Sequence, residues 1–338
     1  MTGDILSTIG NTPLVRLSRA IEGAPFDLYA KLESFNPGGS IKDRTAYSMI
    51  RGALEEGRVW PGATVIESSS GNMGVGLALA CATFGLRFVC VIDPKTTRQN
   101  VEILRAYGAE VDLVAEPDPS TGEFLQARLN RVQELLRELP GSIWIDQYSN
   151  EYNSLAHYQT MREILDQSGG RVDYLFCATS TCGTLRGCSD YLCERELPTK
   201  VIAVDAVGSV IFGGPRVKRL IPGHGAGVVP QLFRPGLAES CVHVTDLDCV
   251  VGCRRLVRRE AILAGGSSGA VLMAVEHMKE KLPRDAVCVA IFPDRGERYL
   301  DTIYSDDWVR AHFGEVSHLW EPPAGPGARA RAGSHTGA

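Results

Sequence analysis

Short apolar runs alternate with longer stretches of helical spacing along most of the chain. The apolar runs have the length of strands, and the stretches between them carry apolar residues at the spacing of a helix face. Strands are expected at 27–33, 64–67, 88–92, 111–114, 174–178, 201–204 and 287–292, and helices at 43–54, 73–84 and 100–106. Continuous apolar strands separated by helices are typical of parallel sheets that are covered on both faces. The pattern therefore predicts an α/β protein.

Length and charge narrow the class of protein. A chain of 338 residues is near the practical limit of one hydrophobic core, so two lobes are expected. The net charge of -5 argues against nucleic acid as a partner, because no excess of basic side chains is present to neutralise its phosphates. No apolar run is long enough to span a membrane, and the residues after Met1 do not resemble a signal peptide. We expect a cytoplasmic protein, with a disordered tail at 321–338, which is rich in Pro, Gly and Ala.

The 10 cysteines do not have the spacing of a zinc site or a disulfide framework. The chain contains no C-x-x-C, and Cys249 and Cys253 have no histidine pair nearby. Other cysteines lie in apolar runs, where cysteine acts as a small hydrophobic residue; these are Cys81, Cys90, Cys177 and Cys288. We expect a reduced protein with no metal site.

The segment NPGGSIKDR (36–44) joins an expected strand to an expected helix. Its two glycines indicate a turn, and Ser40 is expected to cap the helix in a capping box with Asp43. Lys42 then lies in the first helical turn, where the helix dipole disfavours a positive charge. Such a lysine is either a surface residue that starts the helix, or an amine of lowered pKa that reacts with an aldehyde.

Two further strand-to-helix turns consist of small polar residues, and in open α/β sheets ligands bind at such turns. In the first, three serines (68–70) precede Gly71 and Asn72. A plain helix cap would need one hydroxyl, whereas a cradle for a carboxylate would use several hydroxyl and N–H groups. The second is a Ser/Thr/Gly loop without lysine, which suits a phosphate that brings no metal; it contains Ser180, Thr181, Cys182, Gly183 and Thr184. With the reactive lysine, the two loops indicate pyridoxal phosphate and an amino-acid substrate.

Five motifs in this order resemble the fold-type II pyridoxal-phosphate enzymes, in the cysteine synthase and cystathionine β-synthase branch. They are IGNTPLVRL (9–17), NPGGSIKDR (36–44), SSGNMG (69–74), GGSSGA (265–270) and PDRGERYL (293–300). The resemblance extends from about Ile5 to Trp308. It implies a homodimer and a fold like tryptophan synthase β, with two doubly wound open-sheet lobes. We place a smaller lobe with the carboxylate loop at 35–145, and a larger lobe with the phosphate loop at 1–34 and 146–320.

The resemblance also implies roles for individual residues. Lys42 would be the Schiff-base lysine and general base, Asn72 would contact the phenolic oxygen of the cofactor, and Ser267 would meet its ring nitrogen. A serine does not hold this nitrogen protonated, so the ring withdraws electrons less strongly and loss of a β-leaving group is favoured. The alternative for Ser267 is a glycine-rich turn or helix cap. The implied phosphate loop is Ser180–Thr184, and the implied substrate contacts are Ser69, Ser70, Gly71, Asn72 and Gln147.

The sequence differs from the usual pattern of this branch at two places, and these differences indicate a subgroup. Ser180 and Cys182 replace glycines of the usual phosphate loop, and Asp294 with Arg295 replaces small residues before GERYL. Together with VDAVGSVIFG (204–213), these residues resemble the N-(2-amino-2-carboxyethyl)-L-glutamate synthases, which join O-phospho-L-serine to glutamate in siderophore and 2,3-diaminopropionate biosynthesis. The alternative is a cysteine synthase, which would use sulfide.

The subgroup resemblance implies that Arg128 and Tyr148 contact the acceptor. Arginine has the forked geometry that suits a carboxylate, although Arg128 also fits an exposed helix arginine. Arg219 either faces the phosphate leaving group or is a plain surface arginine, and we favour the surface position.

Overall fold

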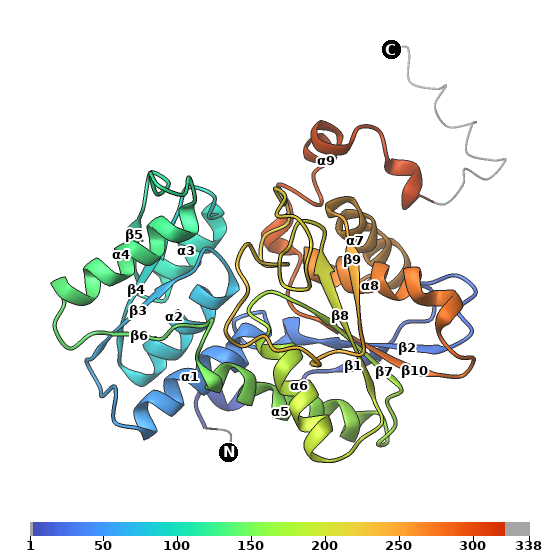
Figure 1. Ribbon diagram of the computed structural model, residues 1–338, viewed down its shortest axis with the longest axis horizontal. Helices are drawn as coiled ribbons and strands as arrows, with labels where there is room; N and C mark the ends of the chain where they lie inside the picture. The colour runs from blue at the N-terminus through green and yellow to red at the C-terminus, as the bar shows by residue number, and fades with distance from the viewer. Residues whose placement is uncertain (1–2, 322–338) are drawn as a thin grey trace, which may run out of the picture.

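The computed structural model describes residues 3–321, which form two open sheets placed side by side (Figure 1). The larger sheet has six strands in the order β1-β2-β10-β7-β8-β9, and the smaller has four in the order β5-β4-β3-β6. Neighbouring strands run parallel, apart from the antiparallel pair β1 and β2. The strands are β1 (Leu14–Arg16), β2 (Asp27–Leu32), β3 (Thr64–Ser68), β4 (Arg87–Ile92), β5 (Glu110–Leu113), β6 (Ile143–Trp144), β7 (Tyr174–Ala178), β8 (Lys200–Ala206), β9 (Ser240–Val244) and β10 (Val287–Phe292).

Helices cover both faces of the six-stranded sheet. Because successive side chains of a strand point to opposite faces, Cys288 and Ala290 of β10 pack with α7 and α8, while Val289 and Ile291 pack with α5 and α6. Figure 1 shows α7 and α8 above this sheet and α5 and α6 below it. These helices are α5 (Glu151–Gln167), α6 (Gly183–Glu194), α7 (Asp246–Glu260) and α8 (Gly266–Met278).

The four-stranded sheet is also covered on both faces. Val132 and Leu135 of α4 pack on Ile66, Val89 and Val91, and three other helices cover the opposite face. The helices are α1 (Lys42–Glu55), α2 (Asn72–Phe84), α3 (Arg98–Ala106) and α4 (Phe124–Glu138). The predicted α/β fold with two doubly wound sheets is therefore confirmed.

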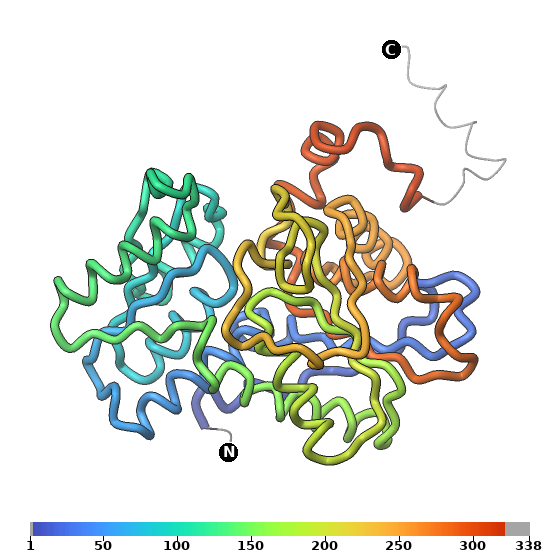
Figure 2. The backbone as a smooth tube through the Cα atoms, in the orientation of Figure 1, coloured from blue at the N-terminus to red at the C-terminus, as the bar shows by residue number. Residues whose placement is uncertain are grey.

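The chain passes from one sheet to the other and back. The tube in Figure 2 starts in the six-stranded part, continues through the four-stranded part, and returns. The chain continues after β10 into α9 (Asp306–Phe313), and the short 3₁₀ helices are η1 (Ile5–Thr8), η2 (Glu33–Phe35), η3 (Lys279–Lys281), η4 (Glu297–Tyr299) and η5 (Ser317–Leu319). Apart from Glu321, the expected disordered tail lies outside the described residues.

The expected strands and helices match the structure, whereas the capping box is wrong. The residue before α1 is Ile41, and Ser40 Oγ accepts a hydrogen bond from the N–H of Lys42 at 3.2 Å. Asp43 Oδ2 instead accepts from the N–H of Gly38 at 2.7 Å. The reason is the turn at Gly39, whose φ of 86° folds Gly38 back over the first helical turn.

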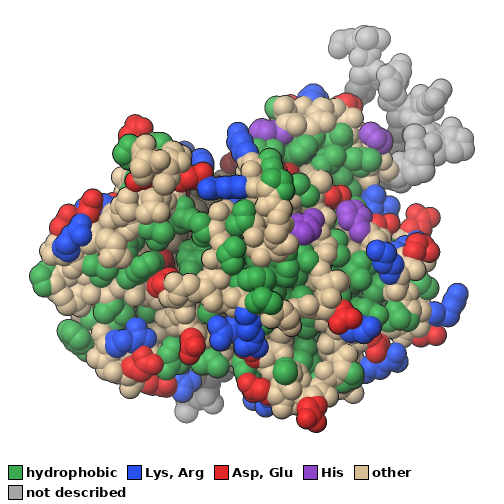
Figure 3. Space-filling view, viewed as in Figure 1, with side chains coloured by type: hydrophobic (Ala, Val, Ile, Leu, Met, Phe, Trp, Pro, Cys, Tyr) green, Lys and Arg blue, Asp and Glu red, His purple; other side chains and the backbone are tan. Residues whose placement is uncertain are grey.

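The cysteines named above lie in the core, and charged side chains lie on the surface. Cys81, Cys90, Cys177 and Cys288 are buried, as predicted. Over the face in Figure 3, basic and acidic side chains are interspersed. Among residues 3–321, no helix has the length and apolar character that crossing a membrane requires.

Candidate active site

Lys42 is the first residue of α1, at the end of the turn that follows β2 and η2. The turn is hydrogen-bonded to the segment that follows β10. The N–H of Ile41 donates to the carbonyl of Pro293 at 2.8 Å, and Arg298 Nη2 donates to the carbonyl of Gly38 at 2.6 Å. Burial lowers the pKa of Lys42 to about 8, and the nearby Cys182 acts weakly in the opposite direction. The structure thus supports the second interpretation of Lys42, an amine of lowered pKa.

The serine loop connects β3 to α2. Ser69 Oγ accepts hydrogen bonds from the N–H groups of Gly71, the N-cap of α2, and of Gly74 in its first turn, at 3.3 and 3.0 Å. Ser68 Oγ is buried without a partner among the described residues. Ser70 is half-buried, and its carbonyl accepts from Asn100 Nδ2 at 3.1 Å. One serine therefore pairs two N–H groups at the helix start, and the loop retains further polar groups.

Gln147 lies beside this loop. Its Nε2 donates to the carbonyl of Ser68 at 3.2 Å, and its backbone N–H donates to Glu67 Oε2 at 3.1 Å. Burial raises the pKa of Glu67 to about 7. Glu67 was not expected from the sequence, and it fixes the backbone of the predicted substrate residue Gln147.

Asn72 opens α2 and is bonded on both sides of its amide. Its Nδ2 donates to Asp294 Oδ2 at 2.7 Å, and its Oδ1 accepts from Arg298 Nη1. Both partners belong to the segment after β10. The predicted cofactor residue is thus connected to the same segment that holds the turn before Lys42.

The phosphate loop connects β7 to α6. Cys182 precedes the helix with a φ of 66°, in the left-handed region that favours glycine. The backbone N–H groups of residues 180–185 donate to no backbone carbonyl in the described part of the chain. A Cβ on Gly183 would collide with Asn153, whose Nδ2 donates to Thr181 Oγ1 at 3.1 Å. The loop therefore presents a row of unpaired donors at a helix start, as an anion site requires.

His157 of α5 joins this loop to the lysine helix, and the sequence analysis missed it. Its Nε2 lies 3.2 Å from both Thr184 Oγ1 and Thr45 Oγ1, and its Nδ1 lies 3.2 Å from Thr160 Oγ1. Burial lowers the pKa of His157 well below its ordinary value, so the ring is neutral. A lone buried histidine in a helix carries no local signal that it connects two loops.

Ser267 is the second residue of α8 and is half-buried. The adjacent Ser268 is fully buried, and its Oγ has no hydrogen-bond partner among the described residues. The turn before α8 is connected to the lysine turn through one segment, because Ala264 bridges to Arg295 and Ser40 bridges to Asp294. Ser267 thus lies at a helix start close to the other loops.

Arg128, Tyr148 and Arg219 form a second group. The Nε of Arg128 lies 3.2 Å from Asp93 Oδ2, and its side chain is 11% exposed, so it is not the exposed helix arginine of the alternative. Arg219 is also half-buried, contrary to our expectation, because its Nη1 donates to the carbonyl of His224 at 2.7 Å. Burial raises the pKa of Tyr148, while the charges of Arg128 and Arg219 act to lower it.

Behind Lys42 lies a buried cluster of four charges, which the sequence analysis also missed. Arg44 bonds to Glu33 at 2.6 Å and to Glu163 at 2.6 Å. Lys31 Nζ donates to Glu163 at 2.9 Å and to the carbonyl of Thr12 at 2.7 Å. The cluster contains two positive and two negative side chains, and it ties β2, α1 and α5 together beneath the lysine turn.

Residues 5–294 match the family described as "Pyridoxal-phosphate dependent enzyme". The chain belongs to this family. The predicted cofactor and enzyme class are therefore confirmed.

Two relatives of this pyridoxal-phosphate enzyme carry the same name. The N-(2-amino-2-carboxyethyl)-L-glutamate synthase of Ralstonia nicotianae is 45% identical over 307 residues, covering 90% of each chain. The synthase of Cupriavidus metallidurans is 45% identical over 309 residues, again covering 90% of each chain. The predicted resemblance to this subgroup is confirmed.

Solved structures support the same fold for the enzyme. An O-ureido-L-serine synthase is 34% identical with a TM-score of 0.82, covering 92% of this chain and 99% of that chain. A cysteine synthase from Entamoeba histolytica is 32% identical with a TM-score of 0.84, covering 90% of this chain and 91% of that chain.

The residues of the site fit pyridoxal phosphate. The unpaired N–H groups of residues 180–185 suit its phosphate, and the lowered pKa of Lys42 suits reaction with its aldehyde. Asn72 and Ser267 would hold the ring. When bound, the cofactor withdraws electrons from the amino-acid substrate and makes its Cα–H acidic.

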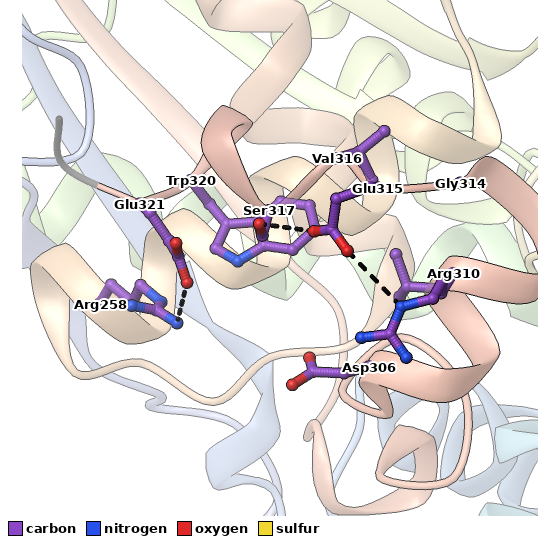
Figure 4. A pocket seen from close by; sticks show the side chains of 10 residues that line it. Arg258, Asp306, Arg310, Gly314, Glu315, Val316, Ser317, Trp320 and Glu321 are labelled. Carbon is purple, nitrogen blue, oxygen red and sulfur yellow. Dashed lines mark hydrogen bonds and ion pairs between the residues drawn. The ribbon is translucent and has the colours of Figure 1, made fainter. Parts of the chain in front are cut away.

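A pocket of about 210 Å³ near the carboxyl end of the described chain is not part of this site. Figure 4 shows Arg258 of α7 pointing to Glu321, and Arg310 of α9 pointing to Glu315, around Trp320. Two of its arginines are paired with acids that also line it, Asp306 is paired with Arg254 outside it, and the pocket contains none of the predicted site residues.

Proposed function

We propose that this enzyme joins O-phospho-L-serine to L-glutamate and forms N-(2-amino-2-carboxyethyl)-L-glutamate. The Cβ–O bond of O-phospho-L-serine breaks, and the α-amino nitrogen of glutamate forms a bond to Cβ. The leaving phosphate carries away the proton that the amine loses. The 45% identity to two synthases of this name supports the proposal.

Lys42 is the base that takes the Cα proton of the donor. A lysine that stays fully protonated near neutral pH is a poor base, and the pKa of about 8 brings the neutral amine within reach. The cofactor phosphate is held by Ser180, Thr181, Cys182, Gly183 and Thr184. The proton carrier and the anion site are thus supplied by the starts of two different helices.

The donor carboxylate binds at the start of α2, in the loop formed by Ser69, Ser70, Gly71 and Asn72. Three N–H groups there, those of Ser70, Asn72 and Met73, have no backbone acceptor in the described part of the chain. The side chain of Gln147 lies against the same loop. A helix start with unpaired donors favours an anion of this size.

The observation that carries the choice of acceptor is the group around Tyr148. Two arginines act on its hydroxyl from outside the donor loop. Glutamate brings a second carboxylate that must leave water, and a buried carboxylate is tolerated when a cation or hydrogen bonds compensate it. Sulfide carries no such group, so a cysteine synthase would not need these arginines for its acceptor.

The test separates donor chemistry from acceptor binding. Replacement of Arg128 by alanine should cost about 2–4 kcal/mol of acceptor binding, and so raise the glutamate concentration needed on the order of 30-fold or more. The phosphate burst from O-phospho-L-serine alone, measured by rapid quench, should stay nearly unchanged. Arg137→Ala is the matched control, because Arg137 is an exposed arginine of the same helix.

The outcomes decide between two functions. A slower phosphate burst in Arg128→Ala would show that Arg128 serves the fold or the donor. If mass spectrometry finds cysteine from donor and sulfide, and no product from donor and glutamate, the protein is a cysteine synthase instead.

We also propose a cytoplasmic homodimer that works in siderophore or antibiotic biosynthesis through 2,3-diaminopropionate. The subgroup resemblance supports this setting. Light scattering of the purified holoenzyme checks the assembly, and a monomer at working concentration would contradict it.

A further inference from the structure

Asp294 is a buried carboxylate that joins several parts of the active site. It follows β10 and is 1% exposed. Its Oδ2 accepts from Asn72 Nδ2 at 2.7 Å and from the hydroxyl of Tyr299 at 2.6 Å. Its Oδ1 is buried without a hydrogen-bond partner in the described part of the chain.

The unpaired oxygen lies against the start of α8. A Cβ on Gly265 would collide with Asp294 Oδ1, and the N–H of Gly265 donates to the carbonyl of Asp294 at 3.2 Å. Gly265 is the N-cap of α8, two residues before Ser267. The positive end of the helix dipole partly compensates a carboxylate in this place.

The amide of Asn72 has one possible orientation between its two partners. Its nitrogen faces the acceptor Asp294, and its oxygen faces the donor Arg298. A flip of the amide would place donor against donor and acceptor against acceptor. An amide nitrogen carries two hydrogens, so one remains available after Asp294 is satisfied.

We infer that Asp294 is a positioning residue, which holds the amide of Asn72 so that its second hydrogen is available to the phenolic oxygen of the cofactor. This inference rests on the proposed function and on the cofactor contact that the family resemblance implies for Asn72. It also gives a reason for the departure of Asp294 from the small residue that cysteine synthases carry before GERYL. A small side chain would leave the nitrogen of Asn72 without this acceptor.

The test uses the cofactor rather than turnover. Asp294→Ala should bind pyridoxal phosphate about tenfold more weakly in equilibrium dialysis, since the buried acceptor that orders the amide of Asn72 is lost. The visible absorption band of the bound cofactor should shift, and Asn72→Ala should shift it in the same direction. The matched control is Glu297→Ala, which removes an exposed acid from the same segment and should change neither reading.

The double variant gives the sharpest reading. If Asp294 acts through Asn72, adding Asp294→Ala to Asn72→Ala weakens cofactor binding no further. Full additivity of the two effects, or an unchanged absorption band in Asp294→Ala, overturns the inference. Should Asp294→Ala fail to fold, Asp294→Leu, which has no acceptor, is read in its place, and wild-type affinity with a wild-type band in a folded Asp294→Leu overturns it.

The failure of this inference is distinguishable from the failure of the proposed function. A wild-type enzyme that makes the glutamate product while Asp294→Ala binds cofactor normally retains the function and loses the inference. A protein that responds to Asp294→Ala as expected and yet makes cysteine from sulfide, and not the glutamate product, retains the inference and loses the function.

Discussion

Two lysines at the edge of the same turn have opposite surroundings. Lys31 on β2 is fully buried, and its Nζ donates to the carbonyl of Thr12, to Glu163 and to Gln167, at 2.7 to 2.9 Å. Lys42 on α1 is half-buried, and in the described part of the chain no acidic side chain is paired with it. Lys31 is held by a network of acceptors, whereas the amine of Lys42 has no acid paired with it in the described part of the chain.

The comparison shows how a reactive group is held without being neutralised. Arg44 lies two residues after Lys42 and bonds to both Glu33 and Glu163, while the pKa of Glu163 is lowered to about 2 by Arg44 and Lys31. Arg44 therefore anchors the start of α1 in a balanced cluster. Glu33 and Glu163 are paired with Arg44 and Lys31, so neither carboxylate is paired with Lys42, where it would raise the pKa of the lysine.

The most severe change should be Lys42→Ala. We expect turnover to be abolished and the borohydride-trappable link to pyridoxal phosphate to disappear, because no other amine occupies this helix start. Mass spectrometry after borohydride treatment measures the link, and Lys281→Ala, at an exposed lysine, is the control. Retention of a trapped cofactor in Lys42→Ala would assign the covalent bond to another lysine.

Breaking the balanced cluster should cost stability. Arg44→Met leaves Glu33 and Glu163 with Lys31 as their remaining cation, so we expect a loss of about 3–5 kcal/mol in the free energy of unfolding. Arg51→Met is the control on the same helix, because Arg51 forms an exposed pair with Glu55 and should change stability by about 0.5 kcal/mol or less. Equal effects in urea unfolding would mean that the cluster contributes no more than a surface pair.

The lowered pKa of Lys42 predicts a pH dependence of stability. Between pH 8 and 10.5 the unfolded chain holds a proton on Lys42 that the folded protein has released. Stability therefore rises with pH in this window relative to Lys42→Ala, by about 1–3 kcal/mol, and the difference is constant below pH 8. Urea unfolding of both cofactor-free proteins across the window measures it, and parallel curves would contradict the lowered pKa.

The smallest effect is expected at Cys182. The backbone of the phosphate loop is strained at this residue, whereas the residues of the charge cluster have no such backbone strain. At most positions a protein with glycine is less stable than one with alanine. At position 182, however, an alanine would keep the unfavourable φ of 66°, which a glycine tolerates. We expect Cys182→Gly to be more stable than Cys182→Ala by about 1 kcal/mol in thermal unfolding. The opposite order would show that burial of the side chain, with Ile211 and Leu232, outweighs the backbone strain.

Much of the fold was predictable because its signals are local. The strand 287–292 and the helix 73–84 are continuous apolar runs, and the structure has them at nearly the same bounds. The strands that were missed are β1, β6 and β9. Two of these are very short, and β9 is a sheet-edge strand that contains Ser240 and His243, so their pairing is decided by neighbours rather than by periodicity.

The sequence by itself determined where a lysine and small polar residues stand at the starts of helices. A lysine after two glycines, a triple serine and a Ser/Thr/Gly loop are each legible within about ten residues, since turns and helix starts depend on local backbone preferences. The tertiary structure decided how those residues are used. Asn72 meets Asp294 across 222 positions, and Lys31 meets Glu163 across 132, so no local pattern can pair them. Whether a charge is neutralised or left reactive depends on what is packed around it, and packing exists only in the folded chain.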